Sequence, residues 1–327
     1  MRDASRDNVD VLSARILIPF AAAGLLASAQ PADPQASERI RVGDSTIEVR
    51  FAPGNLDLSR AQVRTWIANA AEAVAQYFGR FPLAQARVLV RPVEGRQGVF
   101  RGTTWGYRGS GSALTRISIG ERTSTAELDD DWMMTHELTH MAFPDIAGEG
   151  REHHWIEEGM ATYIEPIARA QIGQLSVDRV WGDMIRFMPR GLPREGDQGL
   201  DGTHTWGRTY WGGALFWLLA DVQIREQTQN RQGLEDAMRA ILNAGGTQDQ
   251  ERPIERVLET GDRALGVSVL ENLYNQMKAT AVHTDLPALW RRLGVEANGD
   301  KVIYDDKAPL AAVRRAITAP EKQIGRR

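Results

Sequence analysis

The sequence predicts an α+β fold in which a small N-terminal lobe built on a mixed sheet precedes a mainly helical lobe. Three observations carry this prediction. Strand-like alternation of apolar and polar residues is confined to the chain before residue 125. Beyond that point apolar residues recur with a helical period to about residue 293. The length of 327 residues, with 42% hydrophobic and 25% charged residues, is typical of a globular chain with one large or two smaller lobes.

The first 29 residues have the order of a secretory signal peptide. An apolar run over residues 16–26 is followed by Ala27-Ser28-Ala29, an A-x-A pattern that predicts cleavage after Ala29. Three aspartates among the first ten residues are unusual for such a leader, so an uncleaved anchor or an ordinary apolar leader is the alternative. The run is shorter than the roughly 20 residues that span a bilayer. We therefore expect a periplasmic or secreted protein with no membrane span after cleavage.

Residues 30–124 are expected to form the sheet lobe. A helix begins after Ser59 and ends at Gly79. Strands are expected at residues 46–51, 87–92, 99–106 and 114–119. We expect the strand at residues 114–119 to be an edge strand, with which an extended peptide could pair.

Residues 125–295 are expected to form the helical lobe, and residues 296–327 a C-terminal extension whose last residues fray. Helices are expected at residues 127–143, 155–165, 175–188, 209–226, 232–243 and 265–281. The glycine-containing segment 189–208 is expected to be a long loop, and loops of that length are often functional.

Composition excludes several kinds of chemistry. The chain has no cysteine, which rules out disulfides, thiolate metal sites and a cysteine nucleophile. Any metal must therefore be bound by His, Asp or Glu. The net charge of −4 provides no basic field, so we expect no nucleic-acid partner.

The informative motif is His136-Glu137-Leu138-Thr139-His140, an H-E-x-x-H in a helical segment. Residues four apart lie on one helix face, so the two histidines can present ring nitrogens to one ion. Glu137 lies about 100° around the helix from His136, where it can reach a water molecule held by that ion. The spacing therefore predicts two metal ligands and a general base. Four of the six histidines fall between His136 and His154, which adds weight to this interpretation.

Two histidines leave a catalytic zinc ion one protein ligand short of the usual three. Position 146, where the metzincin spacing would place a third histidine, holds Ile146. The next acidic helix starts near Trp155, and its carboxylates are the candidates for the third ligand. On that helix Glu158, Thr162 and Glu165 share one face.

The run H-E-L-T-H followed by W-I-E-E-G-M-A-T-Y resembles the gluzincin pattern H-E-x-x-H…W-x-x-E-G-x. The resemblance implies a thermolysin-like catalytic domain that binds one zinc ion per chain and cleaves peptides or proteins. It assigns the third ligand to Glu158, with 17 residues between His140 and Glu158. Glu157 is the alternative ligand. Glu137 is then the general base that activates water for attack on the peptide carbonyl.

A second segment, Thr209-Tyr210-Trp211-Gly212, resembles the Y-x-x-G segment of the aminopeptidase-N and glycyl-aminopeptidase families. This resemblance implies that the Tyr210 hydroxyl donates to the transition-state oxyanion; a packing tyrosine is the alternative. The G-A-M-E-N segment of the aminopeptidase-N family is absent, so no carboxylate for the substrate amino terminus can be named. Internal cleavage of peptides is therefore slightly favoured over removal of N-terminal residues.

Other candidates complete the predicted site. Thr162, Glu165, His154 and His204 are possible neighbours of the ligands or cleft residues, and His153 is either a cleft residue or a surface histidine. Two other functions stay open. One is a zinc-binding interaction module with little or no activity, and the other is a zinc hydrolase of a non-peptide amide or ester.

Overall fold

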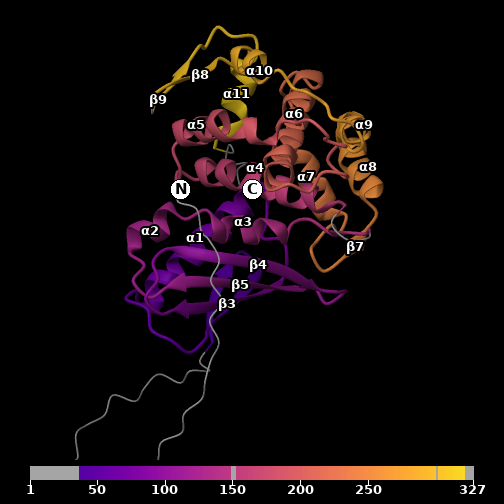
Figure 1. Cartoon of the computed structure of the whole chain (residues 1–327). Helices are drawn as coiled ribbons and strands as arrows, with labels where there is room; N and C mark the ends of the chain where they lie inside the picture. The colour runs from indigo at the N-terminus through magenta and orange to yellow at the C-terminus, as the bar shows by residue number, and fades with distance from the viewer. Residues whose placement is uncertain (1–36, 149–151, 300, 321–327) are drawn as a thin grey trace, which may run out of the picture. The chain divides into compact units, whose positions relative to one another are not determined.

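A five-stranded mixed sheet forms the N-terminal part of the structure and helices form most of the remainder, which confirms the predicted α+β fold (Figure 1). The structure is a computed structural model that describes residues 37–148, 152–299 and 301–320. The predicted leader, residues 1–29, lies outside the described residues.

The sheet has the strand order β1-β2-β3-β5-β4. Its strands are β1 (Glu38–Val42), β2 (Ser45–Phe51), β3 (Gln85–Val93), β4 (Val99–Tyr107) and β5 (Ser112–Gly120). β3 pairs parallel with both β2 and β5, whereas the β1–β2 and β4–β5 pairs are antiparallel. The predicted helix is α1 (Arg60–Phe78), which starts with a capping box at Ser59 and ends at Gly79 with φ of 77°.

The prediction that residues 114–119 form an edge strand is wrong. These residues belong to β5, which pairs with β3 on one side and β4 on the other. In the β4–β5 hairpin, the second strand, β5, lies next to β3 inside the sheet, and the first strand, β4, forms the edge. Alternation within a strand reports which face is buried but does not report the strand's neighbours.

The helix predicted at residues 127–143 is two helices, α2 (Thr125–Asp130) and α3 (Met133–His140). Asp131 breaks the run with an extended backbone, and its carboxylate accepts a hydrogen bond from the Met134 amide at 3.1 Å. An aspartate that binds a nearby backbone amide competes with helix continuation. α3 is thereby free to take its own direction between the sheet and α4 (His154–Gln171), with contacts to β4 and β5 on one side and α4 on the other (Figure 1).

The rest of the helical region follows the predicted order with shifted ends. It contains α5 (Val177–Phe187), the 3-10 helix η1 (Met188–Gly191), the π-helix η2 (Gly207–Gly212), α6 (Gly213–Gln227), α7 (Leu234–Asn243), α8 (Ile254–Leu265), α9 (Val269–Met277) and α10 (Leu286–Leu293). The prediction of one helix at residues 265–281 is wrong. Residue 265 ends α8, which was not predicted, and Gly266 caps α8 in the left-handed conformation before α9 begins at Val269. Two short strands, β6 (Asp145–Ile146) and β7 (Glu251–Arg252), pair in parallel.

Within the described residues, which stop at 320, the C-terminal extension has more regular structure than the polar sequence predicts; residues 321–327 lie outside them. It forms a hairpin of β8 (Val295–Asn298) and β9 (Lys301–Tyr304), followed by α11 (Ala311–Thr318). Arg314, at the start of the tail expected to fray, is buried and donates to the carbonyl of Gly294 at 2.6 Å. Arg314, from the polar C-terminal tail, therefore caps the C-terminal end of α10.

A buried polar network ties α4 to α6 and α7. Asp221 on α6 accepts hydrogen bonds from the Tyr163 hydroxyl at 2.9 Å, from Arg225 Nε at 2.8 Å and from the Leu234 amide at 3.0 Å. Arg225 also pairs with Glu235 on α7 at 2.6 Å. All three helices are therefore held together by one guanidinium and the two carboxylates that it pairs with.

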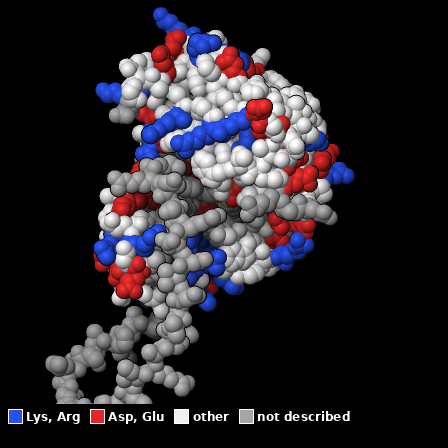
Figure 2. Space-filling model, viewed as in Figure 1, with Lys and Arg blue, Asp and Glu red and all other residues white. Residues whose placement is uncertain are grey.

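The surface is of mixed sign. On the face seen in Figure 2, Lys and Arg side chains of the described residues are interspersed with Asp and Glu side chains. None of the helices in the described ranges has both the length and the apolar character that crossing a bilayer requires.

Candidate metal centre

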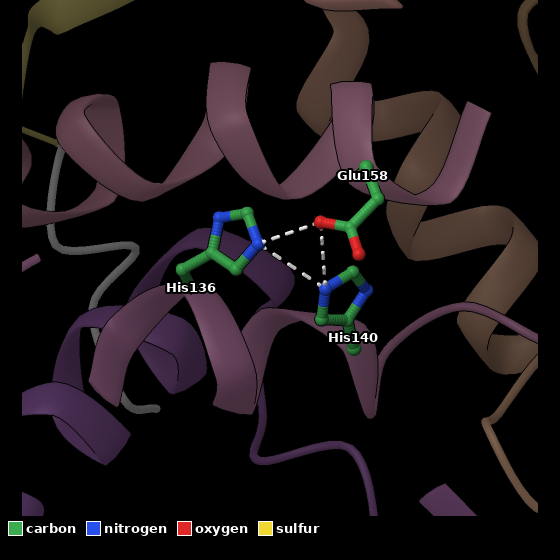
Figure 3. A group of neighbouring side chains, drawn as sticks. All are labelled: His136, His140 and Glu158. Atoms are coloured by element: carbon green, nitrogen blue, oxygen red, sulfur yellow. Dashed lines mark hydrogen bonds and ion pairs between the residues drawn. The ribbon is translucent and has the colours of Figure 1, made fainter. Parts of the chain in front are cut away.

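His136, His140 and Glu158 converge from two helices on one point (Figure 3). Both histidines lie on α3, four residues apart, and Glu158 lies on α4 one turn after its start. His136 Nε2 is 3.0 Å from Glu158 Oε2 and 3.3 Å from His140 Nε2, and His140 Nε2 is 3.6 Å from the same carboxylate oxygen. The three side chains are largely buried, with 4%, 11% and 13% of their surface exposed.

This triangle has the size of one face of a tetrahedral zinc site. Zinc binds nitrogen and carboxylate oxygen at about 2.0–2.1 Å, and tetrahedral angles then place ligand atoms about 3.3–3.4 Å apart. The observed sides of 3.0, 3.3 and 3.6 Å bracket that value. Two imidazoles and one carboxylate are also a known catalytic zinc set with an open fourth position. The residues present therefore fit a zinc ion.

The charges around the triangle favour a cation. Burial by itself would lower the pKa of His140, but the hydrogen bond and negative charge of Glu158, with further acidic neighbours, raise it to about 9. Burial would raise the pKa of Glu158, yet its bonds to His136 and His140 hold that pKa far below its ordinary range. The site therefore stabilises positive charge at the point where the three ligand atoms meet.

Glu137 lies beside the triangle and is held by the sheet. Its side chain is buried, and Thr104 on β4 donates to its Oε2 at 2.8 Å. Because Glu137 follows His136 directly on α3, its carboxylate is displaced around the helix from the ligand atoms, as the sequence predicted. Sequence reasoning missed Thr104, since nothing in a strand residue's local pattern indicates a partner on a distant helix.

Glu157 has a different task from Glu158. Its Oε1 accepts the backbone amide of Ile146 at 2.9 Å and so anchors the short strand β6 to α4. Burial raises the pKa of Glu157 to about 7 despite that hydrogen bond. Of the two adjacent glutamates considered as third ligand, the structure therefore directs Glu158, and not Glu157, toward the histidines.

Tyr210 lies next to the triangle on the π-helix η2. Its ring is 6.3 Å from the His136 ring with 28° between the planes, and the Trp206 ring stacks with it at 5.6 Å. Two glycines bring α4 close to the start of α6, which directly follows η2: a Cβ on Gly159 would lie 2.3 Å from the Gly213 backbone. Single π-helical turns are frequent at functional sites, and this one was not predicted from the sequence.

The remaining predicted residues divide into two groups. His154 lies at the site, with its Nε2 3.5 Å from Glu158 Oε1, and Thr162 follows Glu158 by one turn of α4. Glu165, expected as a possible neighbour of the ligands or a cleft residue, is buried and forms an ion pair with Arg169 at 2.9 Å. Arg169 also donates to the carbonyl of Asp129 on α2 at 2.9 Å, so this ion pair packs against α2.

His153 and His204 line a separate cavity of about 620 Å³ near the start of α4. Asp201, also in its lining, accepts from Trp155 Nε1 at 2.7 Å and lies 3.6 Å from His153 Nδ1. The nearby Asp201 carboxylate outweighs partial burial and raises the pKa of His153. His204 itself is exposed, and the structure does not bring it into the triangle of ligand atoms.

Comparison with known proteins identifies the fold. Neither a scan against protein-family models nor a search of the curated proteins gives a match. Among solved structures, the chain is similar to an aminopeptidase N family protein from Idiomarina loihiensis, with a TM-score of 0.58 and 14% identity over 80% of this chain and 49% of that one. It is also similar to the M1 zinc metallopeptidase from Deinococcus radiodurans, with a TM-score of 0.50 and 16% identity over 76% of this chain and 52% of that one.

The fold is therefore of the zinc metallopeptidase type, and the gluzincin-like fold predicted from the sequence motifs is confirmed. The chain spans about half the length of the solved structures it matches. At this level of identity the likeness establishes a shared fold, and activity has to be argued from the residues of the site.

Proposed function

We propose that this protein is a zinc-dependent metallohydrolase that cleaves peptide bonds, with one zinc ion held by His136, His140 and Glu158. The observation that carries the proposal is the triangle of three ligand atoms with the dimensions of a zinc site. The fold supports it, and a variant of the Deinococcus enzyme is described as bound to a Tyr-Ser-Ala substrate. A peptide is therefore the first substrate class to test.

The roles of the side chains follow from their places. The zinc ion that these residues would hold would supply a Lewis acid that makes water a stronger nucleophile. Glu137 accepts a proton from the water molecule that attacks the peptide carbonyl and returns this proton to the leaving amine. Tyr210, next to His136, donates its hydroxyl to the oxyanion that develops on the carbonyl.

The edge strand β4 supplies a place for the substrate backbone. It carries Thr104, which contacts Glu137, so a peptide paired along this edge passes the proposed base. This role was expected for residues 114–119 and moves to β4 because β5 is paired on both sides. Export of the protein and the absence of a nucleic-acid partner remain part of the proposal.

The test begins with metal content. Protein never exposed to a nickel column is analysed for zinc, and about one zinc ion per chain is expected. His136→Ala and His140→Ala should each lose it. Equal zinc in these variants and the parent would overturn the ligand assignment.

Activity is tested by digesting a diverse peptide library and reading the products by mass spectrometry. The parent, Glu137→Gln and Glu72→Gln are compared, since Glu72 is an exposed glutamate on α1 far along the chain from the site. Cleavage by the parent and by Glu72→Gln, with most of that turnover lost in Glu137→Gln, supports the proposal. Products cut at internal bonds and products shortened from the N-terminus distinguish the two modes of cleavage. Bound zinc with no peptide product would overturn peptidase activity in favour of a non-peptide hydrolase or a binding module.

A further inference from the structure

The edge strand β4 is fixed to the motif helix α3 at several points. The Gly102 amide donates to Met133 Sδ at 3.0 Å, at the first residue of α3. At the C-terminal end of α3, the backbone of Gln248 packs against Gly106 on β4, and the Gln248 backbone amide donates to the Met141 carbonyl at 3.3 Å. Between these attachments β4 lies directly against Glu137. These contacts at both ends of α3 therefore fix the distance between β4 and the proposed base.

A pair of threonine hydroxyls reaches Glu137 from the sheet. Thr104 and Thr115 are direct cross-strand partners on β4 and β5, with their hydroxyl oxygens 2.7 Å apart. The Thr104 oxygen is also 2.8 Å from Glu137 Oε2 and 2.9 Å from the Glu137 carbonyl. Thr104 has one hydroxyl proton, and an ionised carboxylate is its stronger acceptor. Thr115, which is fully buried, then donates to Thr104, and Thr104 donates to Glu137.

Gly102 makes the room that the carboxylate occupies. A Cβ at this position would lie 2.5 Å from Glu137 Oε1, 2.6 Å from its Cγ and 2.8 Å from its Cδ. The backbone conformation at position 102 does not require glycine, because φ there is not positive. The residue before it, Arg101, has φ of 59°, and the β4–β5 register shifts between Phe100 and Thr103. Such bulges re-aim neighbouring residues, often beside active sites.

We propose that Gly102, Thr104 and Thr115 form a cradle that positions Glu137 for proton transfer. Gly102 leaves space against Oε1, and the two hydroxyls hold Oε2. The inference rests on the proposed function of Glu137 as base, and it adds that the sheet, not the helix alone, sets the direction of the carboxylate. These three residues act through Glu137 and are positioning residues.

Four variants separate the hydroxyl from the strand that carries it. Thr104→Val removes the hydroxyl and keeps the β-branched shape that suits a strand. Thr104→Ser keeps the hydroxyl. Gly102→Ala inserts the methyl group that Glu137 leaves no room for. Thr46→Val is the matched control, because Thr46 lies on β2 of the same sheet, with β3 and β5 between it and β4.

Crystal structures of the zinc-loaded parent and variants give the first readout, which does not depend on activity. We expect the Glu137 carboxylate to leave its position in Thr104→Val and Gly102→Ala and to keep it in Thr104→Ser and Thr46→Val. A carboxylate that stays in place in both Thr104→Val and Gly102→Ala overturns the cradle. If no variant or parent cleaves any peptide, the proposed function fails while these structures still decide the positioning.

Steady-state kinetics on a peptide that the parent cleaves give the second readout. A misplacement of about 1 Å costs on the order of 100-fold in rate, so kcat should fall about 10- to 100-fold in Thr104→Val, with KM within about twofold. Thr104→Ser should recover most of kcat, and zinc content should not change. In a Glu137→Gln background the Thr104→Val change should have little further effect. An equal fall in both backgrounds, or the same loss of zinc and melting temperature in Thr104→Val and Thr104→Ser, would contradict positioning through Glu137.

Discussion

Replacing Arg225 by methionine should destabilise the protein because it leaves the buried Asp221 and the half-buried Glu235 without their cation. Arg225 is the only cation that the buried network described above places on both Asp221 and Glu235. The exposed fractions of the Arg225 and Asp221 side chains are 5% and 2%, so water cannot replace the lost partner. Removing one member of a buried ion pair costs about 3–5 kcal/mol. We expect a loss of that size in the free energy of unfolding.

The loss should depend on pH in a defined direction. Burial and the charge of Asp221 raise the pKa of Glu235 to about 7, although Arg225 opposes them. A carboxyl whose pKa is raised on folding binds more protons in the folded state, so stability falls as pH rises from about 4.5 to about 7. Without Arg225 the pKa of Glu235 rises further, and the fall continues above pH 7. The deficit of Arg225→Met relative to the parent should therefore be larger at pH 8 than at pH 5.5.

Urea denaturation of both proteins at the two pH values measures this, with Arg263→Met as the matched control. Arg263 also pairs with a carboxylate one helical turn away, Glu259, but 74% of its side chain is exposed. Exposed pairs of this kind contribute about 0–1 kcal/mol. A loss below about 1 kcal/mol in Arg225→Met, or a deficit that shrinks as pH rises, would refute the reasoning.

Three further predictions concern the site and the leader. Glu158→Gln should lose most bound zinc, as read by elemental analysis. Glu157→Gln should keep its zinc and lose about 1–3 kcal/mol of the free energy of unfolding, as read by denaturation, because its hydrogen bond to the Ile146 amide on β6 is weakened. Zinc loss in Glu157→Gln alone would reverse the ligand assignment. Tyr210→Phe should lower kcat on a cleaved peptide about 10- to 1000-fold with zinc and fold unchanged, and an unchanged kcat would leave Tyr210 a packing residue. Intact-mass measurement of protein from its native host should show an N-terminus at Gln30, and a retained segment up to Ala29 would contradict export by a cleaved leader.

Local sequence carried the chemistry of the site because its parts are close along the chain. The spacing of His136 and His140 puts both rings on one helix face whatever the rest of the fold does. Helix-forming periodicity after residue 125 and alternation before it were enough for the α+β class. Capping signals were equally local, and Ser59 and Gly79 bound α1 as predicted.

What required the tertiary structure was every choice that depends on a distant partner. The resemblance had assigned the third ligand to Glu158, but the task of Glu157, whose carboxylate accepts the Ile146 amide, depended on how α4 packs and is not contained in the sequence pattern. Strand order placed β4, and not β5, at the edge beside Glu137, since alternation reports burial and is silent about neighbours. Residues of ordinary appearance, Gly102 and Thr104, acquired their relation to Glu137 only through that packing. The sequence by itself therefore determined which chemical groups the site contains, and the packing of β4 and α4 around α3 decided how those groups are aimed.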